Sequence, residues 1–220
     1  MRLMSASIVA GLAAALCASA ASAAVININN GDSDYGSIAY TGLAGAPDSA
    51  GAAAVWNSYN ANPTNTSRTL SLVDSFGAAT PVTYTTTFTR GYVASRNGLI
   101  SSLINETSPQ TFTLTGLNVS TSYDLYFYSY GGGANTTNFT VGATTVSPLS
   151  TPTASTSIVA SDWAMMTVNS SGTGTITGTV AAATGDDWGR FNGMQIVVPE
   201  PASLGLLSLA GIALMRRRRA

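Results

Sequence analysis

The sequence predicts one all-β domain, a sandwich or jelly roll, flanked by two short apolar terminal segments. Thr, Ser, Gly, Asn and Val dominate the middle of the chain. Short runs there alternate apolar with polar residues, and Gly and Asn turn signals recur about every ten residues, a spacing typical of two-sheet sandwiches. Residues 24–198 are long enough to form a single domain that buries roughly 70% of its unfolded surface.

Several segments carry the strand pattern. In residues 82–89, Val82, Tyr84 and Phe88 fall on one face and threonines on the other, because successive side chains of a strand point to opposite faces. A short helix is predicted at 98–105, and the Ser/Thr/Pro-rich segment 147–157 is predicted as a surface loop. The other predicted strands span 25–29, 70–73, 111–114, 123–130, 163–168, 173–180 and 191–198.

The N-terminus predicts a cleaved export signal. Arg2 precedes an apolar run over residues 8–17, and the Ala-Ser-Ala at 21–23 has the small-x-small pattern of a signal-peptide cleavage site. Cleavage at the end of this motif is expected, with Ala24 as a close alternative. A retained first transmembrane helix is the other possibility, but the apolar run is short. Residues 1–23 are therefore predicted to be a signal peptide.

The C-terminus predicts a membrane segment. Pro199 and Pro201 fix two φ angles, so no helix runs back into the preceding domain. Residues 202–215 carry no charge and would span roughly 21 Å as a helix, against about 30 Å of hydrocarbon core. A buried C-terminal helix is the alternative, but a core helix would show a polar face. The basic residues that would stop translocation and stay cytoplasmic are Arg216, Arg217, Arg218 and Arg219.

The order of these C-terminal elements resembles the PEP-CTERM sorting signal of exopolysaccharide-producing Gram-negative bacteria. The matching residues are Pro199, Glu200 and Pro201, the apolar segment, and the four arginines. The resemblance implies an exosortase, a membrane protease-transpeptidase that would cut near Pro-Glu-Pro and release or reattach the domain outside the inner membrane. A permanent single-span anchor in the inner membrane is the alternative. Processing would leave the protein at the cell surface or in the extracellular matrix.

Four short motifs in the middle of the chain resemble a family of extracellular jelly-roll domains often found ahead of such sorting tails. Such domains are similar to galactose-binding-like and carbohydrate-binding sandwiches, which implies their fold and leaves the ligand open. Leu117, six residues before Tyr123, resembles the corner in which a Tyr hydroxyl bonds back to the loop before its strand. The motifs are Val55-Trp56-Asn57, the segment Leu72 to Gly77, Phe112 to Leu117 with Tyr123 to Tyr126, and Phe191 to Ile196.

The composition excludes several chemistries. The only cysteine, Cys17, lies in the predicted signal peptide, and the chain has no His and no Lys. Ser-His and Cys-His catalysis and zinc sites built on His or Cys are therefore excluded. Residues 24–198 carry four Arg against eight Asp and one Glu, a net charge of −5, so no nucleic-acid partner is expected. A non-enzymatic protein is expected. The alternative is an extracellular enzyme that acts on polysaccharide with Asp carboxylates alone.

The predicted strand over 123–130 supplies the candidate glycan-binding residues. Its first face, with Tyr123, Leu125 and Phe127, is expected in the core. The second face bears Asp124, Tyr126, Tyr128 and Tyr130. On a wet outer face these tyrosines would form a platform for sugar rings of an exopolysaccharide. Under covering loops they would be buried. Arg90 and Arg96 are separate candidates, either for an acidic glycan or for pairing with surface Asp residues.

A structural calcium ion is the one cofactor that the sequence suggests. Asp32 and Asp34 place oxygen ligands at alternate positions, as calcium loops do. Asp186 and Asp187 would complete this site if the first and last strands are neighbours. However, Tyr35 stands where an EF-hand has Gly, and no Glu follows at the twelfth position. An Asx-rich solvated turn without a metal is therefore the alternative.

Overall fold

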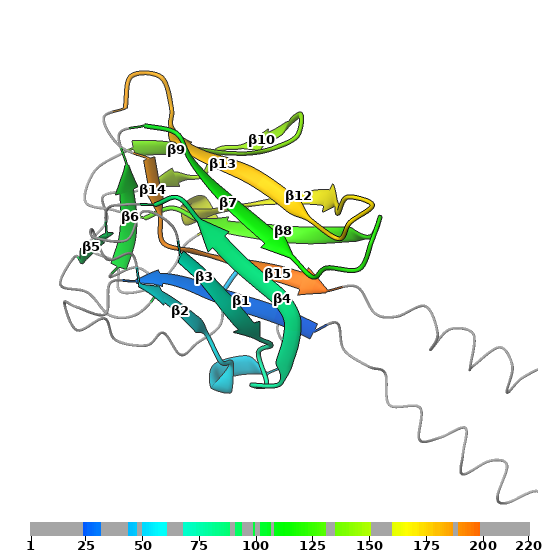
Figure 1. Cartoon of the computed structure of the whole chain (residues 1–220). Coiled ribbons are helices and arrows are strands. Elements are labelled where there is room, and N and C mark those ends of the chain that lie inside the picture. Colours follow the sequence, from blue (N-terminus) through cyan, green and yellow to red (C-terminus); the bar gives the residue numbers. More distant parts are fainter. Residues whose placement is uncertain are drawn as a thin grey trace, which may run out of the picture. The chain divides into compact units, whose positions relative to one another are not determined.

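Two β-sheets packed face to face enclose the hydrophobic core (Figure 1). The all-β sandwich that the sequence predicts is confirmed. Within the part of the chain described below, no helix is long and apolar enough to cross a membrane. The predicted signal peptide and membrane segment lie outside the described residues. The structure, a computed structural model, describes residues 24–31, 44–47, 50–60, 68–88, 91–93, 99, 102–106, 108–130, 135–150, 160–186 and 189–198.

The first sheet has five strands in the order β12-β8-β15-β1-β2. The first and last strands of the domain, β1 and β15, are antiparallel neighbours whose pairing runs from Ala24 opposite Val198 to Asn29 opposite Gly193. The pair β1 and β2 is parallel, and the other pairs are antiparallel. The strands are β1 (Ala24–Gly31), β2 (Asn57–Asn60), β8 (Ser122–Tyr128), β12 (Trp163–Asn169) and β15 (Gly193–Val198).

The second sheet has seven strands, six of them in the order β10-β9-β13-β7-β4-β3, with β11 also paired to β9. A small third sheet has the order β14-β6-β5 and contacts the sandwich at β9 and β1. Short 3-10 turns, η2 (Gly51–Ala53) and η4 (Ala160–Asp162), precede β2 and β12. The strands are β3 (Arg68–Val73), β4 (Ala79–Thr86), β5 (Gly91–Val93), β6 (Ser102–Glu106), β7 (Gln110–Thr115), β9 (Asn135–Val141), β10 (Thr144–Val146), β11 (Leu149–Ser150), β13 (Ile176–Ala182) and β14 (Gly189–Phe191).

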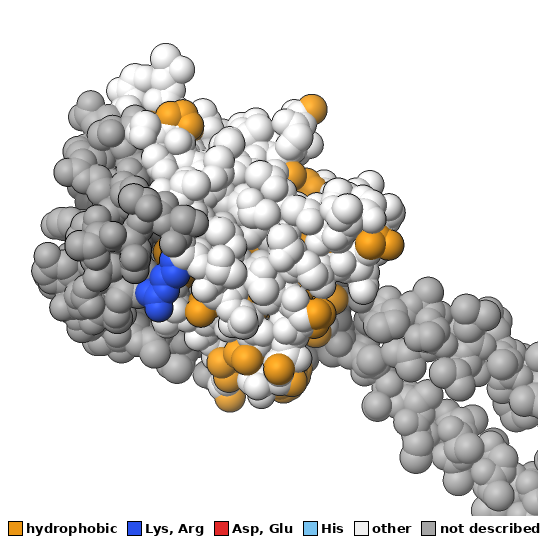
Figure 2. Space-filling view, in the orientation of Figure 1, with side chains coloured by type: hydrophobic (Ala, Val, Ile, Leu, Met, Phe, Trp, Pro, Cys, Tyr) orange, Lys and Arg blue, Asp and Glu red, His pale blue; other side chains and the backbone are white. Residues whose placement is uncertain are grey.

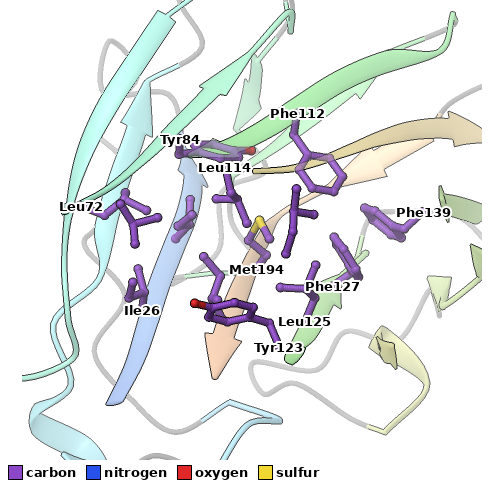
Figure 3. Packing of buried hydrophobic residues seen from close by; sticks show 14 of the residues in the cluster. Ile26, Leu72, Tyr84, Phe112, Leu114, Tyr123, Leu125, Phe127, Phe139 and Met194 are labelled. Atoms are coloured by element: carbon purple, nitrogen blue, oxygen red, sulfur yellow. The ribbon is translucent and has the colours of Figure 1, made fainter. Parts of the chain in front are cut away.

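Alternation along the strands fills the space between the two sheets. Tyr123, Leu125 and Phe127 of β8 point into the core, as their period of two predicts (Figure 3). Phe127 stacks on Phe139 of the opposite sheet with ring centroids 4.6 Å apart, and Phe191 packs against both rings. The outer face of the seven-stranded sheet has the opposite character. In the view of Figure 2 this face is mostly polar, with hydrophobic atoms in places and one basic side chain at its left.

Two sequence predictions about local structure are wrong. Residues 102–105, predicted as part of a helix, lie in strand β6, because the backbone of this strand pairs with β5 on one side and β14 on the other. These non-local ladders override the local pattern of leucine and isoleucine. The segment 147–157, predicted as a loop, contains the short strand β11, which pairs with the start of β9.

The predicted tyrosine corner is confirmed. The backbone N–H of Asn118 donates to the hydroxyl of Tyr123 over 2.9 Å, and Tyr123 is buried. The loop before β8 begins at Gly116, whose φ of +77° suits glycine. A Cβ on Gly116 would lie 2.0 Å from the carbonyl oxygen of Pro81, so glycine also permits this close approach.

We expect Tyr123→Phe to lower the free energy of unfolding by about 1–2 kcal/mol, because the part-buried Asn118 N–H loses its acceptor. Urea denaturation of the two proteins measures the difference. Tyr126→Phe is the matched control, since the hydroxyl of Tyr126 has no hydrogen-bond partner among the described residues. Equal midpoints for Tyr123→Phe and the unchanged protein would show that the corner contributes no stability.

Candidate functional site

The outer face of the five-stranded sheet has a covered part and an open part. Strand register aligns Tyr126 of β8 with Gln195 of β15 on one side and with Met165 of β12 on the other. Gln195 is buried, whereas Met165 is 43% exposed. The boundary between the two parts therefore runs along β8, at Tyr126.

A backbone segment covers the part next to β15. The N–H of Gly45 donates to the hydroxyl of Tyr128 over 2.6 Å, and the N–H of Ala46 donates to Oε1 of Gln195 over 3.0 Å. The Tyr128 hydroxyl in turn donates to the same Oε1 of Gln195. These bonds satisfy buried polar groups and fix the segment to the sheet.

The polar network continues across the sheet to the next covering segment. Nε2 of Gln195 donates to Oδ1 of Asn27 over 2.8 Å, and Nδ2 of Asn27 donates to the carbonyl of Val55 over 3.1 Å. Trp56 follows Val55 and packs edge-on against Tyr128, with ring centroids 6.5 Å apart. The covering segments are therefore held by hydrogen bonds and by an aromatic contact.

This cover decides which of the predicted platform residues can reach a ligand. Tyr128 is only 1% exposed and Tyr130 only 2%, so neither ring is accessible. The N–H of Tyr130 donates to Oδ1 of Asn192 over 2.5 Å, within the same buried region. The expectation of an exposed face does not hold for these two tyrosines, which are buried as the alternative anticipated. Asp124 and Tyr126 remain partly exposed.

The open part forms a compact aromatic site at the edge of the sheet. The rings of Tyr126 and Trp163 lie 5.4 Å apart between centroids, inclined by 39°. Trp163 packs directly on Gly45, where a Cβ would lie 2.8 Å from Cδ2 of the indole. Exposed Met165 and Thr167 follow Trp163 along β12. We call Asp124, Tyr126, Trp163, Met165 and Thr167 the Tyr126–Trp163 site.

A single carboxylate, that of Asp124, lies near Tyr126 on the same face of β8. The Thr167 hydroxyl donates to Oδ1 of Asp124 over 2.6 Å. Partial burial raises the pKa of Tyr126, and the negative charge of Asp124 raises it further. The phenol of Tyr126 therefore remains a neutral hydrogen-bond donor. Taken together, the site offers two ring faces, hydroxyl groups and one anionic acceptor.

Sequence reasoning missed Trp163 and Met165. Both lie in a correctly predicted strand, where Trp163, Met165 and Thr167 alternate with core residues. That alternation is the signal that could have found them. It becomes informative only once β12 is known to pair with β8, because the register places Trp163 opposite Tyr128 and diagonal to Tyr126, whose ring it contacts.

Of the four predicted calcium ligands, Asp186 alone lies within the described residues. Asp186 accepts from the backbone N–H of Thr136 through Oδ2 over 2.7 Å, which anchors the start of β9. Burial lowers the pKa of the nearby Arg190, and the charge of Asp186 opposes that shift. The calcium site stays a prediction. Its other residues, Asp32, Asp34 and Asp187, lie outside the described residues, as do Arg90 and Arg96.

Two of the four jelly-roll motifs pack together as scaffold. The N–H of Val55 donates to the carbonyl of Ser75 over 2.8 Å. Nδ2 of Asn57 donates to the carbonyls of Asn27 and Val73, and Oδ1 of Asn57 accepts from the N–H of Val73. These bonds join β2 to β1 and to the end of β3. The motifs therefore position the covering segment and do not contribute to the open site.

Comparison with known proteins identifies the C-terminal segment. Residues 197–219 match the PEP-CTERM protein-sorting motif, which contains the predicted sorting residues. The motif indicates export and membrane-associated sorting to the cell surface, and it implies processing by an exosortase. It begins inside the fold, because Val197 and Val198 are the last residues of β15.

None of the curated proteins matches the chain. Among solved structures, a family 35 carbohydrate binding module from Clostridium thermocellum is similar, with 15% identity and a TM-score of 0.33 over 59% of this chain and 90% of that one. CBM35 from Paenibacillus barcinonensis has 16% identity and a TM-score of 0.33 over 52% and 93%. TmCBM61, solved with beta-1,4-galactotriose, has 14% identity and a TM-score of 0.31 over 60% and 88%.

We expect Tyr128→Phe to loosen the cover, because it removes the acceptor of the Gly45 N–H and the donor to Gln195. The free energy of unfolding should fall by about 1–3 kcal/mol. Hydrogen exchange followed by mass spectrometry should show faster exchange at Gly45 and Ala46. The amides of β13 serve as the internal control. Unchanged exchange at Gly45 would show that the hydroxyl does not hold the segment.

Proposed function

We propose that this protein is a non-enzymatic, exported glycan-binding protein that acts as an adhesive or structural component of an exopolysaccharide matrix. The partly exposed ring pair of Tyr126 and Trp163, with the carboxylate of Asp124 near Tyr126, carries the proposal. The ring faces suit the apolar C–H faces of sugar rings. The carboxylate and the phenol suit the sugar hydroxyls, and a charge-assisted hydrogen bond is stronger than a neutral one.

Rigidity beneath the rings supports binding at this site. Trp163 packs on Gly45, and the N–H of Gly45 is itself bound to the buried Tyr128. The aromatic rings are thus held before a ligand arrives, which reduces the entropy lost on binding. A polymer presents many copies of its repeat, so modest affinity at one site produces strong retention of a densely displayed protein.

The proposal includes export of the domain and its sorting to the cell surface or the matrix. The sorting motif at residues 197–219 supports export. In this proposal the host is a Gram-negative bacterium, the signal peptide is removed after Ala23, and residues 24–198 form the exported domain. Residues 199–220 would hold the protein at the inner membrane until an exosortase acts. The mature protein would then lie at the cell surface or in the matrix.

The defining experiment tests retention and turnover together. The full chain, purified in a detergent without a sugar headgroup, is passed over the immobilised exopolysaccharide of its host. We expect saturable retention without release of reducing ends. Trp163→Ala and Tyr126→Ala should each weaken retention at least about tenfold, a loss of roughly 1.4 kcal/mol. Phe76→Ala, which removes an aromatic ring 62% exposed outside the site, is the matched control.

Melting curves must accompany these variants, because both rings also pack against the covered cluster. Weaker retention at an unchanged melting midpoint assigns the effect to ligand contact. Retention that survives both substitutions would contradict glycan binding at this site. Release of reducing ends or of unsaturated products would overturn the non-enzymatic assignment in favour of an enzyme that uses Asp carboxylates.

The fate of the tail has its own test. We expect the intact mass of the protein isolated from its host to correspond to a chain that starts at Ala24 and ends near Pro199–Pro201. A mass that includes Arg216 to Arg219 would instead identify a permanent membrane anchor without processing.

A further inference from the structure

Asp124 is the only acidic residue of the Tyr126–Trp163 site, and one of its two carboxylate oxygens is free of hydrogen bonds to the described residues. Oδ1 accepts the hydroxyl of Thr167 over 2.6 Å. Oδ2 has no hydrogen-bond partner among the described residues. An oxygen that accepts nothing from the protein is available to a hydroxyl group of the ligand.

No cation of the neighbouring strands compensates this carboxylate. The sequences of β8, β12 and β15 contain no Arg, and the chain contains no Lys. The covering residues 44–47 are likewise uncharged. Residues 24–198 contain four Arg and nine acidic residues. Asp124 is therefore the only charged residue of these three strands.

We infer that the Tyr126–Trp163 site takes uncharged polysaccharides and that Asp124 discriminates against polymers bearing carboxylate or sulfate groups. The inference rests on the proposed function and names its ligand class. A neutral sugar donates its hydroxyls to the open oxygen of Asp124. An anionic group placed within about 6 Å of that oxygen is repelled, which costs at least about tenfold in affinity near a protein surface. Salt screens this repulsion, because the Debye length falls from about 30 Å at 0.01 M to about 3 Å at 1 M.

Matched polymer pairs test the inference without knowledge of the natural ligand. Each neutral polymer that retains the full chain, for example a dextran or a galactan, is compared with its carboxymethylated form. Both are measured in a chelator, so that no divalent cation bridges two carboxylates. At low ionic strength we expect the carboxymethylated form to bind at least about tenfold more weakly. The gap should narrow when salt is raised to about 0.5 M.

The variant Asp124→Asn distinguishes the effect of the Asp124 charge on binding from the effect of the net charge of the domain. The variant removes the negative charge and keeps one carbonyl oxygen that can accept the Thr167 hydroxyl, while an NH2 donor replaces the open oxygen. Its binding to the neutral polymer should fall a few-fold. Its binding to the carboxymethylated polymer should rise to within about threefold of the neutral one. An unchanged melting midpoint confirms that the variant is folded.

The possible failures are distinguishable. Equal binding of both polymers, or preference for the carboxymethylated one, overturns the inferred ligand class. If Trp163→Ala still abolishes binding of the polymers, glycan binding at this site is retained. Discrimination that persists in Asp124→Asn assigns the selectivity to the charge of the domain and overturns the role of Asp124. Absence of binding to every polymer, the host exopolysaccharide included, overturns the proposed function and the inference with it.

Discussion

The last strand of the domain, β15, lies between β1 and β8 and joins the two halves of the five-stranded sheet. Its inward side chains, Met194 and Ile196, are fully buried in the core. Its outward side chain Gln195 holds the cover through Ala46, Tyr128 and Asn27. Because β15 precedes the sorting tail directly, the sheet and its cover can be completed only when nearly the whole chain is available.

The covered network also explains the position of the candidate site. A sandwich sheet needs only one buried face, yet here hydrogen-bonded segments bury part of the outer face as well. Gly45 of the described cover packs against Trp163, and the partly exposed rings of Tyr126 and Trp163 lie beside it, toward the edge strand β12. The same contacts that remove Tyr128 from solvent therefore hold Trp163 in place. Scaffold and site share one set of interactions.

The sequence predicted the parts of the fold that depend on local periodicity. The alternation of Tyr123, Leu125 and Phe127 correctly assigned the core face of β8, and the spacing from Leu117 to Tyr123 correctly assigned the corner. Local periodicity cannot report what covers a face. The side chains of Tyr126 and Tyr128 point to the same face of β8. A backbone segment some eighty residues earlier in the chain buries Tyr128 and leaves Tyr126 partly exposed. The helix predicted at 98–105 failed for a similar reason, since Ile104 and Asn105 pair with β14, far along the chain.

Ala24 and Val198 face each other in one rung of the β1–β15 ladder. Directly opposed residues of an antiparallel pair lie about 4.5–5.5 Å apart between Cα atoms, so a two-residue turn could join them as a hairpin. The chain could then be reopened at Gly142, in the turn between β9 and β10, where nothing lies within 4 Å of an added Cβ. Such a circular permutant would retain every strand while having neither a leader nor a sorting tail. The sandwich could thus be studied free of both membrane-directed ends.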